Sequence, residues 1–166
     1  MPAGAPGCRG TRIMTRMNTG VGHLFVYGTL MSATIGAMGK AQRDRLQCEG
    51  IRLGAATMRG AQLYNLGRYP GLVESGDPGH IVHGELIALA NPHITLRWLD
   101  DYEGVVPGDQ DQNEYARLER QVLLANGSAV PVWVPAWVYV FLRDVERYRP
   151  IAGGRWKFAL KGERKI

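Results

Sequence analysis

The apolar positions along most of the chain recur in short runs or in alternation, and Gly and Pro divide them into segments of strand length. The run His23–Tyr27 stops at Gly28, which predicts a buried strand that enters a tight turn. Asn126-Gly127 is a favoured two-residue turn and predicts a hairpin between the segments on either side of it. The other strands predicted from the pattern are 49–59, 61–66, Ile81–Ala90, Ala116–Leu124 and Ala129–Leu142.

One helix is well marked between residues 91 and 104. Asn91 suits the N-cap, Pro92 the first helical position and Gly104 the residue just past the end. Between them the large apolar side chains gather on one side of a helical wheel, with Thr95 as a polar exception. A shorter helix is predicted over Ala41–Cys48. The segments predicted as loops are 31–40, the Gly- and Pro-rich 67–79 and the basic tail after Arg143.

Strands outnumber helices in this pattern, which argues for an α+β fold, and the short punctuated strands indicate a curved sheet or a small barrel. A chain of 166 residues is most simply one domain with a real core, which we expect over residues 21–158. Residues 1–20 are rich in Gly, Pro, Thr and Arg and are expected to form a disordered extension. Residues 159–166 are expected to form a basic tail.

The net charge of +5 is concentrated at the two ends of the chain. Residues 1–20 carry three arginines and no acid, and residues 143–166 carry eight basic and three acidic residues. The segment between them, 21–142, has nine basic and twelve acidic residues and is mildly acidic. Binding of nucleic-acid phosphates needs many Lys and Arg on one face, so the middle of the chain argues against a nucleic-acid-binding domain.

The absence of several patterns argues against further classes. No apolar run approaches the length of a transmembrane helix. Cys8 and Cys48 are far apart in the sequence and have neither metal nor redox spacing, so a disulfide is not expected. A reduced, cytoplasmic setting is expected instead. His80 and His83 would point to opposite faces of a strand, which argues against a shared metal. The G-x-S-x-G nucleophile elbow and the glycine-rich phosphate-binding motifs are also absent.

Glu103 is the first candidate for chemistry. On the helical wheel it falls between Leu96 and Leu99, whereas Asp100 and Asp101 are predicted to face solvent. Partial burial and the negative end of the helix dipole would both raise the pKa of Glu103. A carboxylate with a raised pKa can accept and donate protons near neutral pH. The alternative, a solvated Glu at a frayed helix end, stays open from the wheel alone.

The second candidate is the turn Tyr27-Gly28-Thr29-Leu30, directly after the first predicted strand. A sharp turn at Gly can aim successive backbone N–H groups at one point, where they bind a carboxylate or an oxyanion. An ordinary turn after a core strand is the alternative. The aromatic residues of the last strand are expected to cover one of its faces as core or to line a pocket: Trp133, Trp137, Tyr139 and Phe141.

Together these segments resemble the γ-glutamylcyclotransferase-like family, and specifically its γ-glutamylamine cyclotransferase branch. The segments that carry the resemblance, over residues 23 to 156, are FVYGTL (Phe25–Leu30), GRYPGLV (Gly67–Val73), HGELIAL (His83–Leu89), LDDYEG (Leu99–Gly104), Tyr115-Ala-Arg117 and the later WVYVF strand. The resemblance implies a small mixed, mostly antiparallel β-barrel with one or two packed helices and a pocket at one end. It implies that Glu103 is the catalytic residue, that Tyr27 to Leu30 bind substrate through their backbone, and that Tyr139 contacts substrate.

The reaction implied by the resemblance is an intramolecular one. The α-amine of an L-γ-glutamyl amine attacks its own γ-carbonyl, closes 5-oxoproline and releases the amine, so neither a metal nor a cofactor is expected. The expected partner is this small γ-glutamyl substrate. Binding to a nucleic acid or to a membrane is not expected. Three alternatives stay open: a cyclotransferase for glutathione or γ-glutamyl peptides, a non-catalytic small-molecule-binding member of the fold, and nucleic-acid binding by the basic ends. The sequence leaves the oligomeric state unknown.

Overall fold

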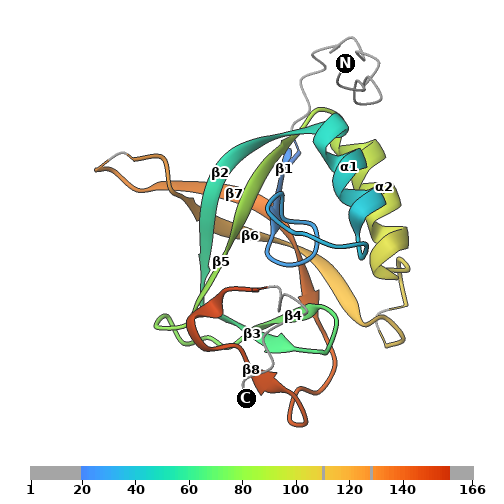
Figure 1. The fold of residues 1–166 in the computed structure, drawn as a ribbon, viewed down its shortest axis with the longest axis vertical. Coiled ribbons are helices and arrows are strands. Elements are labelled where there is room, and N and C mark those ends of the chain that lie inside the picture. The colour runs from blue at the N-terminus through green and yellow to red at the C-terminus, as the bar shows by residue number, and fades with distance from the viewer. Residues whose placement is uncertain (1–19, 110, 128, 158–166) are drawn as a thin grey trace.

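The computed structural model describes residues 20–109, 111–127 and 129–157, and the strands among them form a small closed barrel (Figure 1). Five strands lie in the order β1-β5-β2-β6-β7. All their pairings are antiparallel except that of β1 with β7, which is parallel at Leu24 and Trp137. The strands are β1 (His23–Val26), β2 (Gly50–Arg59), β5 (Ile81–Leu89), β6 (Tyr115–Leu124) and β7 (Val132–Phe141). The expected α+β fold with a mixed, mostly antiparallel barrel is confirmed.

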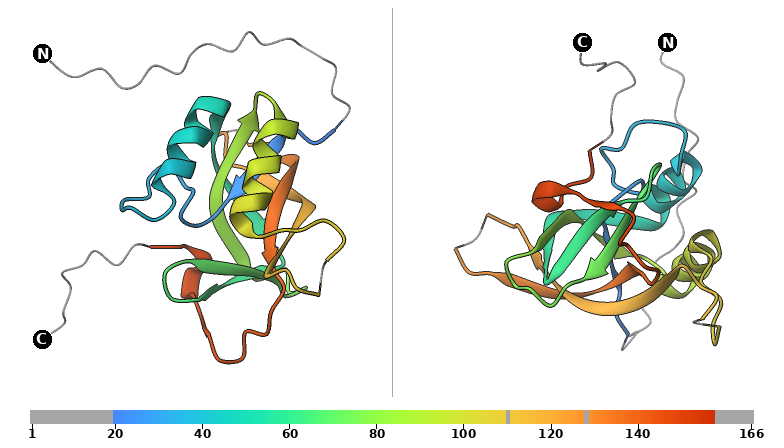
Figure 2. Two further views of the ribbon diagram at one scale, coloured as in Figure 1. Left: turned by 90° about the vertical axis from the view of Figure 1, so that its right-hand side faces the viewer. Right: turned by 90° about the horizontal axis from the view of Figure 1, so that it is seen from below.

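A second, three-stranded sheet lies at the end of the barrel away from the helices (Figures 1 and 2). Its order is β4-β3-β8, and its strands are β3 (Ala61–Asn65), β4 (Pro70–Glu74) and β8 (Arg149–Pro150). The prediction of a continuous loop over residues 67–79 is therefore wrong at β4. Leu72 of β4 is paired with Leu63 of β3, and both are fully buried. The tail after Arg143 likewise contains β8 and a 3-10 turn, η1 (Ala152–Gly154).

Helices α1 (Lys40–Glu49) and α2 (Pro92–Glu103) lie next to each other along the barrel (Figure 2). The end of α1 is tied to α2 because Glu49 accepts hydrogen bonds from Thr95 Oγ1 and Trp98 Nε1, each at 2.7 Å. These bonds, together with one from Arg45, outweigh the effect of burial and lower the pKa of Glu49. They also explain why Thr95, polar on the apolar side of its helix, is completely buried.

The ends of α2 agree with the sequence prediction. The Asn91 side chain accepts a hydrogen bond from the Ile94 N–H, and Pro92 occupies the first turn. Gly104 has φ 68°, the left-handed conformation typical of the residue that ends a helix. Because the helix ends there, Glu103 is its last residue, and its position relative to the barrel is fixed by the packing of the whole helix.

The core has two parts, on the inner and outer faces of the barrel. Successive side chains of β1 point to opposite faces, so this strand contributes to both parts of the core. Phe25 packs inside the barrel, while Leu24 and Val26 face the helices. Leu96 and Leu99 of α2 pack on the outer side with Leu24 and Val26. The carboxyl end of β1 thus emerges between these two cores, and the chain that follows it begins in buried surroundings.

Two further predictions about the last hairpin are wrong. The paired strands end at Leu124 and begin again at Val132, so the connection spans residues 125–131 and is not a two-residue turn at Asn126-Gly127. Trp133 does not belong to the core, because it is 47% exposed. The guanidinium of Arg59 covers its ring at 5.8 Å from the centroid.

Several expectations fall outside the described residues. The disordered extension over 1–19, the basic tail over 159–166 and the state of Cys8 all lie there. Within the described residues, none of the helices has both the length and the apolar character needed to span a membrane.

Candidate active site

A cavity of about 280 Å³ opens where the end of β1, the end of α2 and the starts of β4 and β6 meet. Every site residue predicted from the sequence lines it: Tyr27, Gly28, Thr29, Leu30, Glu103 and Tyr139. These residues come from three separate parts of the chain and are brought together by the barrel. Their roles in substrate binding and catalysis stay predictions.

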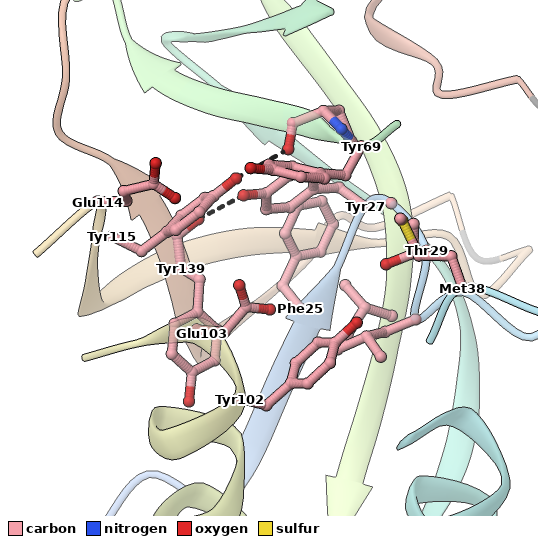
Figure 3. A pocket seen from close by; sticks show the side chains of 14 residues that line it. Phe25, Tyr27, Thr29, Met38, Tyr69, Tyr102, Glu103, Glu114, Tyr115 and Tyr139 are labelled. Carbon is pink, nitrogen blue, oxygen red and sulfur yellow. Dashed lines mark hydrogen bonds between the residues drawn. The ribbon is translucent and has the colours of Figure 1, made fainter. Parts of the chain in front are cut away.

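The Glu103 carboxylate points into this cavity, toward the rings of Tyr27 and Phe25 (Figure 3). Burial raises its pKa from the ordinary 4.5 to about 7. No hydrogen bond or cation among the described residues counteracts that effect. At neutral pH the carboxyl is thus divided between its protonated and ionised forms, the condition that suits a group for proton transfer in both directions.

Asp100 faces the barrel, so the prediction that it faces solvent is wrong. Its carboxylate accepts two hydrogen bonds from Arg117, from Nε at 2.8 Å and Nη2 at 3.1 Å, and one from Tyr139 Oη at 2.7 Å. Arg117 and Tyr139 are directly opposite each other on β6 and β7, so the two strands present a charged and a polar group together to α2. A wheel of one helix contains no information about such partners.

This contact with Asp100 determines what Tyr139 offers to the cavity. The hydroxyl of Tyr139 is directed away from the other tyrosines and toward α2, while its ring forms the wall beside Glu103 (Figure 3). Burial, and then the neighbouring Asp100 carboxylate, raise the pKa of this phenol, which stays neutral. Tyr139 therefore contributes a flat apolar surface.

Two more tyrosines form the opposite wall of the cavity, and their hydroxyls are both used within the protein. Tyr27 Oη donates to the carbonyl of Tyr139 at 2.6 Å, and Tyr115 Oη donates to the carbonyl of Pro70 at 3.3 Å. Burial raises the pKa of both phenols, so they remain neutral donors. These bonds connect β1, β4, β6 and β7 around the cavity.

Residues 28–39, which lead from Tyr27 to α1, form a third wall and are called here the β1–α1 segment. The Gly28 carbonyl accepts hydrogen bonds from the Met31 N–H and from Thr34 Oγ1, both at 3.1 Å. Among the described residues no acceptor is assigned to the N–H groups of Gly28, Thr29 and Leu30. These donors at the cavity wall are suited to a carboxylate or an oxyanion.

The charged groups on the cavity wall are all acidic. Glu103 and Glu114 are the two carboxylates, and no Lys, Arg or His is among its described lining residues. Negative charge on a bound molecule is therefore left to neutral donors, the backbone N–H groups and side-chain hydroxyls of the described lining. The described residues also contain no group of three or more His, Cys, Asp or Glu arranged to hold a metal ion.

A family model described as gamma-glutamyl cyclotransferase, AIG2-like, matches residues 24–158. The chain belongs to this family. The match covers both the strand-turn segment that leads to Gly28 and the helix that ends at Glu103, so the cavity is built wholly within the family domain.

Relatives in the γ-glutamylcyclotransferase family share most of the chain. The family protein ytfP of Citrobacter rodentium is 33% identical over 134 residues, which are 80% of this chain and 93% of the relative. The solution structure of ytfP from Escherichia coli has 31% identity and a TM-score of 0.53, and the match covers 81% of this chain and 95% of that one. The crystal structure of an AIG2-like protein from Mus musculus has 25% identity and a TM-score of 0.53, over 76% and 81% of the two chains.

The sequence predictions missed more than half of the wall of this γ-glutamylcyclotransferase-family cavity. Tyr69 and Tyr115 stand within the segments that carry the family resemblance, so that signal could have selected them. Tyr102 also stands in such a segment, LDDYEG, directly before Glu103. Nothing in the sequence distinguishes Met38 and Glu114, which reach the cavity only through the course of the chain.

Proposed function

We propose that this chain is a γ-glutamylcyclotransferase-type enzyme that releases 5-oxoproline and a free amine from an L-γ-glutamyl amine. One observation carries the proposal: Glu103, with a pKa of about 7, faces a cavity whose charged wall residues are all acidic. In the proposed reaction the nucleophile is the substrate's own α-amine. The protein therefore has to hold the substrate in a folded conformation and move a proton. Orientation of this kind lowers a barrier by several kcal/mol.

The proposed steps use Glu103 twice. The ionised carboxylate accepts a proton from the substrate α-ammonium, and the freed amine attacks the γ-carbonyl carbon. A C–N bond forms and the carbonyl oxygen becomes an oxyanion. When the oxyanion collapses, the original C–N bond breaks and the leaving nitrogen takes the proton from Glu103. The ring nitrogen, which still carries one proton more than the lactam, passes that proton to the released amine. The products are 5-oxoproline and the protonated amine, and the carboxylate is restored.

Substrate binding in this scheme falls to the β1–α1 segment. The N–H groups of Gly28, Thr29 and Leu30 would hold the α-carboxylate or the developing oxyanion. The Tyr139 ring would support the aliphatic part of the glutamyl group, beside Glu103.

The charge of the cavity favours one class of leaving group. Glutathione and γ-glutamyl peptides release products that carry a carboxylate, whereas a simple γ-glutamyl amine releases a neutral or cationic amine. The exposed Glu114 at the cavity wall, with no basic residue beside it in the described lining, repels the former and attracts the latter. This supports the γ-glutamyl amine over glutathione as substrate.

The test of the proposal is release of 5-oxoproline from a panel of γ-glutamyl compounds. The panel contains γ-glutamyl amines with neutral and cationic leaving groups, γ-glutamyl dipeptides and glutathione. We expect turnover of the amines above that of glutathione. Preferred turnover of glutathione would support the alternative specificity, and no turnover of any member would favour a non-catalytic binding role.

A pair of variants then isolates the proposed catalytic residue. Glu103→Gln keeps the shape of the side chain and should abolish 5-oxoproline release, because an amide cannot accept the proton. Asp101→Asn removes an exposed carboxylate two residues earlier on the same helix and should leave the rate unchanged. Turnover by Glu103→Gln at the rate of the unmodified protein would remove Glu103 from the mechanism.

A further inference from the structure

Arg43 is a buried arginine that bonds the β1–α1 segment and does not itself line the cavity. It lies on α1, is 6% exposed and is not among the residues that line the cavity. No carboxylate among the described residues forms an ion pair with it. Burial of a charge is costly unless hydrogen bonds compensate for it, so its partners indicate why it is there.

Among the described residues, the hydrogen-bond partners of the Arg43 guanidinium are all backbone carbonyls of the β1–α1 segment. Nη1 donates to the carbonyls of Thr29 and Met38, each at 2.7 Å, and Nη2 donates to the carbonyl of Gly36 at 2.6 Å. The guanidinium thus joins the start of the segment, at Thr29, to its later part, at Gly36 and Met38. A planar fork with several diverging N–H groups suits these three acceptors better than the compact ammonium of a lysine.

The bond to Thr29 has a direct consequence for the cavity wall. A trans peptide places its C=O and N–H on opposite sides. Because Arg43 holds the Thr29 carbonyl, the N–H of Leu30 in the same peptide unit is directed away from Arg43. Thr29 and Leu30 line the cavity and Arg43 does not, so this is the orientation in which that N–H can reach a bound molecule.

A second buried charge holds the same segment from β5. Glu85 is 6% exposed and accepts hydrogen bonds from Ser32, from the N–H at 3.1 Å and from Oγ at 2.8 Å. Arg52 pairs with the same carboxylate at 3.1 Å. Glu85 thus holds N–H and hydroxyl donors of the segment, and Arg43 holds its carbonyls, so the two contacts are complementary.

We propose that Arg43 is a positioning residue for substrate binding: it sets the backbone conformation of the β1–α1 segment so that its N–H groups face the cavity, without touching the substrate itself. This inference rests on the proposed function for its kinetic consequence. Its structural consequence, the hold of Arg43 on the segment, is measurable whether or not a substrate is turned over.

The test compares Arg43→Met and Arg43→Lys with a matched control, Arg45→Met. Arg45 lies on the same helix but contacts Glu49 and the Trp98 ring, away from the β1–α1 segment. Two quantities are measured: amide hydrogen exchange of residues 28–39, and KM and kcat for the γ-glutamyl amine that the unmodified protein turns over best. The pH dependence of kcat/KM is recorded for each variant.

For Arg43→Met we expect exchange of the segment to become faster and KM to rise by about tenfold or more, as for the loss of one hydrogen bond to a charged group. Arg43→Lys should lie between Arg43→Met and the unmodified protein. The acid limb of the pH profile should not move, because Glu103 is untouched. Arg45→Met should change neither the exchange of the segment nor KM.

Two results would overturn the inference. One is a folded Arg43→Met or Arg43→Lys protein with unchanged exchange of residues 28–39 and unchanged KM. The other is an Arg43→Lys protein with a lowered melting temperature and an unchanged KM, the result for a merely structural arginine. If the unmodified protein turns over no compound of the panel, the proposed function fails, and the exchange measurement still decides whether Arg43 holds the segment.

Discussion

Gly28 and Pro70 approach each other so closely that Gly28 has no room for a side chain. A Cβ atom at Gly28 would lie 2.8 Å from Pro70 Cγ and 2.9 Å from Pro70 Cδ. The reason for glycine here is thus the neighbouring proline ring, since the φ angle of Gly28 is not positive. Both residues line the cavity, so their contact also fixes the distance between two of its walls.

Gly28→Ala is therefore expected to displace the start of β4 and disturb the cavity. Overpacking of this kind costs about 1–3 kcal/mol of unfolding free energy. We also expect a large loss of 5-oxoproline release, because the N–H groups after Gly28 move with it. Chemical denaturation and the substrate panel measure the two effects.

The control for this substitution is Gly22→Ala, where the nearest atom to the new Cβ would be 3.9 Å away, an ordinary contact. It should be close to neutral. Adding Pro70→Ala to Gly28→Ala removes the atoms of the collision and should recover part of the lost stability. If Gly28→Ala has unchanged stability and activity, the close approach has no consequence for the site.

The helix that carries Glu103 could be predicted because its signals are local. Asn91 and Gly104 mark the two ends, and the apolar spacing places Glu103 between Leu96 and Leu99, which are both buried. The environment of Asp100 could not be predicted in the same way. Its partners, Arg117 and Tyr139, belong to strands whose position relative to α2 depends on closure of the barrel.

Strand β4 and Arg43 show the same limit. The segment around Leu72 is short and flanked by Gly and Pro, and it becomes a strand only because β3 offers a buried partner in Leu63. The sequence of α1 is polar throughout, with Leu46 as its single large apolar residue, so Arg43 has no local feature that separates it from Arg45. Only the course of the β1–α1 segment makes one buried and the other exposed.

The pH dependence of the proposed reaction follows from the pKa of Glu103. The ionised carboxylate is the active form in the free enzyme, so kcat/KM should fall as the pH drops below about 7. Carboxyl ¹³C chemical shifts of Glu103, recorded without substrate, should titrate with the same midpoint. If the shifts titrate near the ordinary value of 4.5 while the acid limb stays near 7, another group controls the rate.

The same raised pKa predicts that Glu103 destabilises the fold when it is ionised. The folded state binds this proton more tightly than the unfolded state does. The stability that goes with the protonated carboxyl is therefore fully present below about pH 4.5 and is lost as the pH rises through about 7. Above pH 7 the cost is at most roughly 3 kcal/mol. Glu103→Gln, which cannot ionise, should therefore be more stable than the unmodified protein at pH 8.

Unfolding free energies measured at pH 5 and pH 8 test this expectation. The advantage of Glu103→Gln should be clearly larger at pH 8 than at pH 5. An equal difference at the two values would mean that the carboxyl is solvated in the folded protein, and the argument for its role in proton transfer would lose its basis.

The bond between Tyr139 and Asp100 leads to a prediction about the role expected for Tyr139 from the family resemblance. Tyr139→Phe keeps the ring that lines the cavity and removes only the hydroxyl that donates a hydrogen bond to Asp100. Because Asp100 retains its two bonds from Arg117, the cost should be about 1 kcal/mol of unfolding free energy. KM should stay within about twofold of its original value, since the contact offered to substrate is the ring face.

Tyr139→Ala is the contrasting variant, because it removes the wall itself. It should destabilise the protein by about 3–5 kcal/mol and raise KM strongly. Steady-state kinetics of the two variants, together with denaturation curves, separate the ring from the hydroxyl. A large rise in KM for Tyr139→Phe would contradict this role of the ring, since it would require the hydroxyl to leave Asp100 and turn toward the substrate.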